Sequence, residues 1–179
     1  MNEAFVGYHA SHEQFPPSSL LRWCRDAEAA GFVGAMCSDH FMPWSDRQGE
    51  SGFAWSWLGA ALEATGLSYG AVCAPVHRYH PAIVAQAFAT LGEMFPGRVW
   101  VAFGSGEHLN ERVVGGEWPS KRLRNERLRE AVDVIRALWE GEQVDLRGRF
   151  FNVVEAKLHT LPPEPPLLLG AAITAETAA

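Results

Sequence analysis

Two hydrophobic patterns alternate along the chain. Short runs that are apolar at nearly every position are separated by longer stretches whose apolar residues recur every three or four positions. The first pattern is typical of parallel strands buried on both faces, and the second is typical of amphipathic helices. The short runs predict strands at residues 4–6, 32–37, 69–73, 99–103 and 167–172.

Capping and helix-breaking residues place the helices between these strands. Pro16-Pro17 introduces the first helix, with Ser18 or Ser19 as its N-cap, and Gly31 lies where its C-cap belongs. The periodicity predicts further helices at residues 54–65, 82–95 and 121–140, and Thr174 as the cap of another one.

The order of these elements limits the fold. The segment 144–153 alternates polar and apolar residues around Arg147-Gly148, which predicts a β-hairpin insertion. Elsewhere strands alternate with helices, which favours an α/β fold with a parallel sheet. From the residues alone, an open doubly wound sheet and a (β/α)8 barrel both fit. A barrel normally needs about 250 residues. As a barrel, residues 1–179 would form a single incomplete domain, the N-terminal half to five-eighths.

Composition excludes several classes of protein. Apolar residues make up 47% and charged residues 20%, which is ordinary for a globular domain. The chain has no run of about 18 apolar residues and does not begin like a secretory signal, so we expect no membrane span and no export. The three cysteines form no C-x-x-C pair, which favours a reduced, cytoplasmic protein. The net charge of −6 argues against nucleic acid and anionic membranes as partners.

Polar and titratable side chains follow the ends of the predicted strands. In both candidate folds, ligands bind at the carboxyl ends of parallel strands. Asp39 and His40 follow the second strand and could form an acid–base pair, although a structural histidine bonded to backbone explains this pattern equally well. Trp44 lies in a loop near His40, where it could stack on a planar ligand.

Other candidate residues carry weaker signals. Glu107 follows Gly104-Ser105-Gly106, a turn whose backbone can approach a flat ligand, but Leu109 replaces the third glycine of the dinucleotide fingerprint, so we exclude Rossmann-type NAD binding. His77-x-x-His80 and His9-x-x-His12-Glu13 have the spacing of metal ligands but lie in predicted loops, so no metal site is expected. The arginines of 121–136 lie opposite an apolar stripe and are predicted to face solvent, not to form a nucleic-acid site.

Several longer motifs occur in a fixed order along the chain. They include Gly7-Tyr8-x-Ala10-Ser11-x-Glu13-Gln14-Phe15, Ser38-Asp39-His40-Phe41-x-Pro43-Trp44, Arg78-Tyr79-x-Pro81-Ala82, Pro96-x-Arg98-Val99 and Gly106-Glu107-x-Leu109-Asn110-Glu111. With these motifs the chain resembles the luciferase-like flavin and deazaflavin oxidoreductases, which are (β/α)8 TIM barrels of the bacterial-luciferase type. Within that superfamily, it is most similar to the glucose-6-phosphate dehydrogenases that use coenzyme F420, a deazaflavin.

The resemblance implies a site for coenzyme F420, or alternatively FMN, on the carboxyl face of the barrel. It assigns catalytic roles to His40 (acid–base work), Trp44 (pocket shape), Glu107 (proton donor to the ring) and Glu13 (a further pocket acid). The implied cofactor-binding residues are Asp39, Val72, Cys73, Ser105, Gly106, Asn110, Gly170, Ala171 and Ala172, the last three of which begin a phosphate-binding region. Members of the family often have a non-proline cis peptide at the strand end that matches residues 72–74.

The function implied by the resemblance is hydride transfer between a small, alcohol-like substrate and coenzyme F420. An FMN-dependent monooxygenase is the alternative within the superfamily, and a non-catalytic fragment of a longer barrel is the alternative from another class. The positions that bind the substrate phosphate in the sugar-phosphate dehydrogenases fall beyond Ala179, so that specificity is not carried over. Members of the superfamily are often dimers, which makes a homodimer an expected state.

Overall fold

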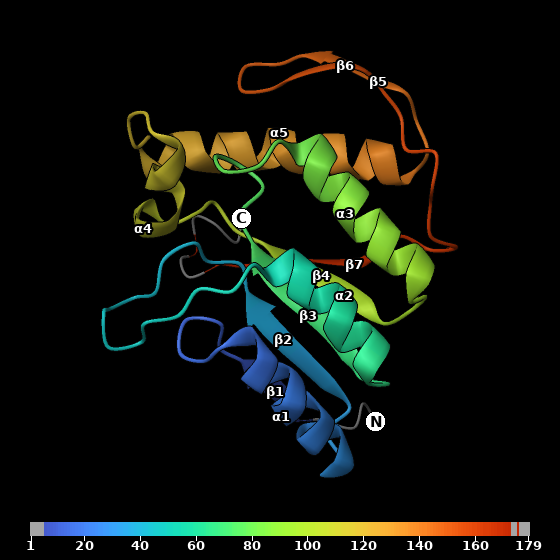
Figure 1. The fold of residues 1–179 in the computed structure, drawn as a ribbon. Helices are drawn as coiled ribbons and strands as arrows, with labels where there is room; N and C mark the ends of the chain where they lie inside the picture. Colours follow the sequence, from blue (N-terminus) through green and yellow to red (C-terminus); the bar gives the residue numbers. More distant parts are fainter. Residues whose placement is uncertain (1–5, 173–174, 176–179) are drawn as a thin grey trace.

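The computed structural model describes residues 6–172 and Ala175, and its main feature is a five-stranded parallel sheet (Figure 1). The strands are β1 (Gly7–Ala10), β2 (Gly34–Ser38), β3 (Ser68–Cys73), β4 (Val99–Phe103) and β7 (Leu167–Gly170). They lie side by side in the order β1-β2-β3-β4-β7, and every neighbouring pair is parallel. The structure thus has the α/β architecture that the alternating pattern predicted.

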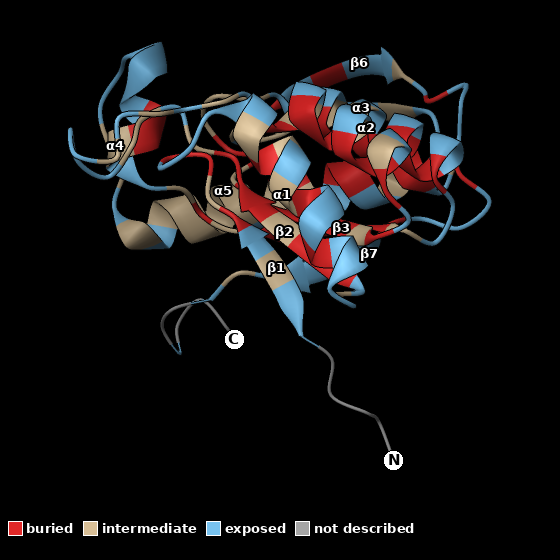
Figure 2. Ribbon diagram, turned by 60° about the horizontal axis from the view of Figure 1, so that its bottom comes forward, coloured by how far each residue is buried: buried red, intermediate tan, exposed pale blue. Residues whose placement is uncertain are grey.

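Helices cover one face of this sheet (Figures 1 and 2). They are α1 (Pro17–Ala29), α2 (Ala54–Ala64), α3 (Pro81–Met94) and α5 (Lys121–Trp139), with a short α4 (His108–Glu111) and a 3-10 turn, η1 (Arg112–Val114), before α5. Alternate strand residues point to the helices, so Ala71, Val101 and Phe103 are buried against helical residues such as Phe88 and Ile135. This packing fixes where each strand ends, and therefore where the loops that follow the strands begin.

The opposite face of the sheet is lined by the other set of alternate residues. Trp100 on β4 lies directly against Gly70 on β3, its partner in the register, where a Cβ atom would approach the indole to about 2 Å. Gly70 is therefore required by this close approach. Leu167 and Leu169 on β7 are 62% and 43% exposed, so this face is only partly covered in the part of the chain that the structure describes.

The predicted hairpin forms a separate two-stranded antiparallel sheet, β5 (Val144–Arg147) and β6 (Asn152–Ala156). The Glu130 carboxylate on α5 accepts hydrogen bonds from the backbone N–H groups of Arg149, Phe150 and Phe151 at 2.8–3.1 Å. A Cβ atom at Gly148 would lie 2.1 Å from the same carboxylate, so this turn needs glycine. One side chain of α5 thus holds the hairpin tip.

Several local predictions need correction. The first strand begins at Gly7 and not at residue 4, and of the predicted segment only Val6 is among the described residues. Helix α1 begins at Pro17 with Pro16 as N-cap, so Ser18 and Ser19 do not cap it. Pro17 has no N–H to satisfy and its φ is already suited to the first helical position.

The remaining points concern helix ends, one short helix and the possibility of membrane spans. Gly31 has a φ of 93° immediately after the C-cap of α1, as predicted. Helix α4 was not predicted, because four residues do not show a helical period. Thr174 lies outside the described residues. None of the helices in the described ranges has the length and apolar character that crossing a bilayer requires.

Candidate active site

A cavity of about 510 Å³ lies at the carboxyl ends of the parallel strands. This volume is within the range of small-molecule sites, about 300–1,000 Å³. Its lining comes from strands β1, β2 and β3, from the loops after β2, β3, β4 and β7, and from α4 and α5: His9, Met36, Ser38, Asp39, His40, Trp44, Val72, Cys73, Ala74, Gly104, Ser105, Gly106, Glu107, Asn110, Glu111, Lys121, Ala171 and Ala172.

Most of the predicted site residues therefore line one cavity. Eleven of the thirteen do so: Asp39, His40, Trp44, Val72, Cys73, Ser105, Gly106, Glu107, Asn110, Ala171 and Ala172. Glu13 is not in the wall but touches His40, and Gly170 is the last residue of β7. The sequence reasoning did not single out Lys121 or Glu111 as site residues. Glu111 ends one of the recognised motifs, whereas Lys121 only begins the segment whose arginines were predicted to face solvent.

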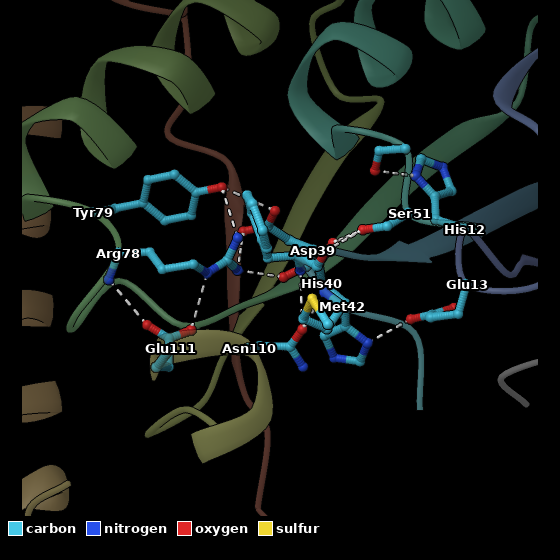
Figure 3. A network of polar contacts seen from close by, with 12 residues as sticks. His12, Glu13, Asp39, His40, Met42, Ser51, Arg78, Tyr79, Asn110 and Glu111 are labelled. Carbon is cyan, nitrogen blue, oxygen red and sulfur yellow. Dashed lines mark hydrogen bonds and ion pairs between the residues drawn. The ribbon is translucent and has the colours of Figure 1, made fainter. Parts of the chain in front are cut away.

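Glu13 and His40 form a short ion pair beside the cavity (Figure 3). Glu13 follows β1 and His40 follows β2, and the parallel pairing of these strands brings the two loops together. Glu13 Oε1 lies 2.5 Å from His40 Nδ1, and the Ser11 hydroxyl donates to Glu13 Oε2 at 2.9 Å. The Glu13 side chain is 3% exposed and that of His40 is 19% exposed, so the carboxylate is the buried partner.

The environment of Glu13 keeps it ionised. Burial raises the pKa of this carboxyl, but hydrogen bonds from His40, the backbone and Ser38 outweigh burial and lower the pKa to about 2. A carboxylate at Nδ1 favours the tautomer that carries its proton there, which leaves Nε2 as the basic nitrogen. His40 also packs edge-to-face on Trp44, with ring centroids 5.0 Å apart. The imidazole is therefore held from two sides.

A second network surrounds Arg78 on the other side of Asp39 (Figure 3). Arg78 Nη2 lies 3.2 Å from Asp39 Oδ2 and its Nε lies 3.2 Å from Glu111 Oε1, while the Tyr79 hydroxyl donates to Asp39 Oδ1 at 3.0 Å. The side chains of Arg78, Asp39 and Glu111 are 7%, 2% and 2% exposed. Arg78 and Tyr79 contact both carboxylate oxygens of Asp39. A cofactor that contacted this carboxylate, as predicted, would therefore share an oxygen with one of these protein groups.

Asn110 has a buried donor that no protein group satisfies. Its Oδ1 accepts from the backbone N–H groups of Phe41 and Met42 at 2.9 Å each, which fixes the orientation of the amide. Its Nδ2 is buried and has no hydrogen-bond partner within the described ranges, and the residue lines the cavity while only 2% exposed. Buried donors in native proteins nearly always have partners, so this amide fits a ligand that presents an acceptor.

Val72 and Cys73 contribute to the shape of the cavity wall and not to its chemistry. Burial, and then the nearby Asp39 carboxylate, raise the pKa of the Cys73 thiol well above its ordinary value, so this cysteine is not a nucleophile at neutral pH. All peptide bonds between the described residues are trans, so the cis peptide that the resemblance implied at residues 72–74 is absent from the structure. The Ala171 N–H donates to the Phe103 carbonyl at 2.8 Å and extends the sheet pairing, so it is not available for a phosphate.

The histidines with metal-like spacing have separate surroundings. His9 lines the cavity, while His12 is fully buried with its Nδ1 3.0 Å from the Gly52 carbonyl. His77 lies 3.2 Å from an Arg127 nitrogen, and burial together with Arg127 and Arg124 lowers its pKa to about 4. His80 caps α3 through its Nδ1, which accepts from the Ala82 N–H.

A second cavity of about 540 Å³ adjoins the first one, and His40 lines both. Its other lining residues are mostly apolar or aromatic: Phe41, Ser51, Phe53, Arg78, Tyr79, Val113 and Val114. His40 therefore stands between a polar cavity and an apolar one.

Comparisons with known proteins agree with this geometry. The family model for luciferase-like monooxygenases matches residues 2–179. The chain is 45% identical over 163 residues to an F420-dependent glucose-6-phosphate dehydrogenase of Segniliparus rotundus, covering 89% of this chain and 49% of the relative. It is 43% identical over 166 residues to the enzyme of the same name from Mycolicibacterium smegmatis, covering 90% and 49%.

Solved structures give the same result. An F420-dependent secondary alcohol dehydrogenase in complex with an F420-acetone adduct superposes with a TM-score of 0.95 at 42% identity, covering 98% of this chain and 54% of that one. An EDTA monooxygenase from Chelativorans sp. BNC1, at 14% identity and a TM-score of 0.83, shares the fold. The chain spans about half the length of these relatives. It belongs to the luciferase-like monooxygenase family.

Proposed function

We propose that this chain carries the deazaflavin-binding and proton-handling part of an F420-dependent oxidoreductase that acts on a small alcohol-like substrate. The observation that carries the proposal is the Glu13–His40 pair, held against Trp44 at the wall of the cavity at the strand ends. The relatives named F420-dependent dehydrogenases, at 42–45% identity, support the choice of cofactor.

The residues of the cavity at the strand ends fit a flat, polar ring system. The unpartnered Asn110 Nδ2 can donate to a ring carbonyl, and Gly106, with a φ of 81°, turns the backbone at the rim without a side chain. Ser105 and Glu107 lie in the same loop, and Ala171 and Ala172 add only methyl groups beside it. A bound deazaflavin would serve there as the hydride acceptor, chemistry that side chains do not supply.

In this proposal the chain's own groups position the substrate and move the protons. Glu13 holds the proton on His40 Nδ1, so His40 Nε2 accepts the hydroxyl proton as the substrate carbon loses hydride. The Trp44 ring limits how the imidazole and the substrate can tilt. Glu107, exposed on the cavity wall, is the residue that we propose to donate a proton to the reduced ring. These groups come from three loops, those that follow β1, β2 and β4.

Titration of the chain with coenzyme F420 and, separately, with FMN tests the cofactor assignment, with tryptophan fluorescence as the readout. We expect saturable quenching by F420, because Trp44 lies in the cavity wall. Saturation by FMN alone would instead place the chain with the flavin-dependent monooxygenases. Binding of neither would overturn the proposal for this chain.

The role of His40 needs a separate measurement. With F420 and isopropanol or glucose-6-phosphate as probe alcohols, loss of the visible absorbance of the oxidised coenzyme reports turnover. We expect the His40→Asn variant to lose about 10²–10⁴-fold in turnover, as is usual when a general base is removed, and to show a different pH profile from the unaltered chain. Unchanged turnover with an unchanged pH profile would exclude the role.

A further inference from the structure

Lys121 is the one side chain of α5 among the residues that line the cavity at the strand ends. It occupies the first turn of the helix, directly after the N-cap Ser120, so its backbone is held by the start of a 19-residue helix. Its ammonium donates to the Ser105 hydroxyl at 2.7 Å, and Ser105 is 4% exposed. The sequence pattern predicted a solvent-facing position only for the arginines of 121–136 and made no prediction for Lys121.

This ammonium has no counter-ion within the described ranges. Lys121 makes no ion pair there, whereas two of the carboxylates of the cavity wall, Asp39 and Glu111, are paired with Arg78. The third, Glu107, is exposed and is not within ion-pair distance of Lys121. A partly buried charge without a partner is unfavourable, so a ligand that brings a negative charge would gain from binding beside it.

The contact with Ser105 leaves both N–H and O–H donors available to a ligand. An ammonium has three N–H donors, and only one is used by the Ser105 oxygen. A hydroxyl that accepts from Lys121 keeps its own O–H to donate. The pair therefore offers both ammonium and hydroxyl donors to one anionic oxygen, at a position fixed by a helix on one side and a strand end on the other.

We propose that Lys121 and Ser105 form an anion-binding subsite within the cofactor cavity. Its ligand is an anionic oxygen, a phosphate or carboxylate, that belongs either to the coenzyme or to a negatively charged substrate. The proposal rests on the proposed function in one respect, since it takes the cavity at the strand ends as the one that binds ligands. It adds an electrostatic determinant of which ligands are accepted.

The chain has only two lysines, Lys121 and the exposed Lys157, which makes a direct test simple. Protein labelled with ¹³C and ¹⁵N in lysine gives two side-chain signals by NMR, and a Lys157→Gln variant assigns them. The probes are inorganic phosphate, coenzyme F420, and the same deazaflavin without its phosphodiester tail. We expect a saturable shift of the Lys121 signal with phosphate at low ionic strength, and little response from Lys157. Equal, non-saturating shifts of both lysines would overturn the proposal.

The variants measure what the charge contributes. Lys121→Gln can still donate to Ser105 but has no charge, and we expect its dissociation constant for phosphate, or for F420 when the coenzyme supplies the anion, to rise about tenfold, as for loss of a charge-assisted hydrogen bond. Lys157→Gln should bind as the unaltered chain does, and Lys121→Arg, which keeps the charge, should bind more tightly than Lys121→Gln. Unchanged affinity of Lys121→Gln for every probe would overturn the proposal.

The arms of the titration also distinguish the source of the anion and the two proposals. A Lys121 shift with F420 but not with the tailless deazaflavin assigns the anion to the coenzyme tail. A phosphate shift that persists in the F420-loaded protein assigns the subsite to an anionic substrate. If F420 binds while Lys121 responds to no probe, this subsite is absent and the proposed function stands. If phosphate shifts Lys121 while neither F420 nor FMN binds, the subsite stands and the proposed function fails.

Discussion

Asp39 and His40 are adjacent in the chain, yet they belong to two regions with different physical properties. Asp39 belongs to a network with Arg78, Tyr79 and Glu111 in which the charged side chains are 7% exposed or less. His40 belongs to a pair with Glu13 and is 19% exposed, with a cavity on each side. Successive side chains at a strand end point in opposite directions, so one strand end supplies both regions.

The difference between the two regions is how completely their polar atoms are satisfied. In the Arg78 network, both Asp39 oxygens and both Glu111 oxygens have partners. In the pair, Glu13 contacts only Nδ1 of His40 and leaves Nε2 uncommitted. A proton acceptor needs such an uncommitted nitrogen. We infer that the Arg78 network contributes mainly to stability and that the Glu13–His40 pair is available for chemistry.

The largest expected effect comes from removing the cation of the network. Arg78→Met keeps most of the length of the side chain but leaves Asp39 and Glu111 as two buried carboxylates without a cation. We expect the free energy of unfolding to fall by about 3–5 kcal/mol, as is typical when one partner of a buried pair is removed. Denaturant unfolding at pH 7 measures this loss.

The matched control for Arg78→Met is Arg122→Ala, which breaks an exposed i,i+4 pair with Glu126. That change should cost about 0.5 kcal/mol or less. If the two variants lose the same stability, the Arg78 network contributes no more than a surface ion pair, and the distinction between the two regions fails.

The next largest effect concerns the buried member of the pair. The pKa of Glu13 is lowered from an ordinary 4.5 to about 2, so its ionised form stabilises the fold fully above about pH 5 and less as the pH falls toward 2. Glu13→Gln should therefore be less stable than the unaltered chain by about 2–3 kcal/mol at pH 7, and this difference should shrink in acid. Unfolding free energies at pH 7, 5 and 3 measure it.

Glu142→Gln, at an exposed glutamate, is the control for Glu13→Gln. Its difference from the unaltered chain should be near zero at all three pH values. A Glu13→Gln difference that stayed constant with pH would mean that the ionisation of Glu13 is not linked to folding.

These two regions also show what can be read from the sequence. The strand 99–103 was predicted to its last residue because it is apolar throughout and is preceded by Pro96-Gly97. Strand β1, Gly-Tyr-His-Ala, was misplaced because it has no apolar run, and it is defined by its pairing with β2. Local pattern therefore predicts strands buried on both faces, and tertiary pairing decides the others.

The candidate site was predictable to a similar degree. The rule that ligands bind at the carboxyl ends of strands, together with the resemblance, gave most of the cavity wall. The pairing of Arg78 with Glu111, 33 residues apart, was not predictable, because it depends on the short helix α4, which carries no periodic signal. Lys121 was missed for a related reason: an apolar stripe shows which helix face packs on the core but not what lies beyond the end of the helix.

A smaller effect is expected at the edge of the Arg78 network. Tyr79→Phe removes the 3.0 Å hydrogen bond from the hydroxyl to Asp39 Oδ1 and keeps the ring in place. The net loss of stability should be about 1 kcal/mol, the usual contribution of one hydrogen bond. Tyr8→Phe, whose hydroxyl makes no hydrogen bond to the described residues, should change stability less. Equal effects of the two substitutions would show that the Asp39 contact contributes nothing measurable.

The smallest effect on stability is expected at Trp44, on the cavity side of His40. The side chain is 52% exposed and packs edge-to-face on the imidazole, so Trp44→Ala should change the free energy of unfolding by about 0.5 kcal/mol or less. Its affinity for F420, measured by calorimetry, should fall about three- to tenfold through loss of an aromatic contact. Phe53→Ala is the matched control, since Phe53 is 56% exposed and lines only the adjoining, apolar cavity. A Trp44→Ala variant that unfolds more easily but binds F420 normally would reverse the comparison, because Trp44 would then belong with the structural network and not with the chemistry of His40.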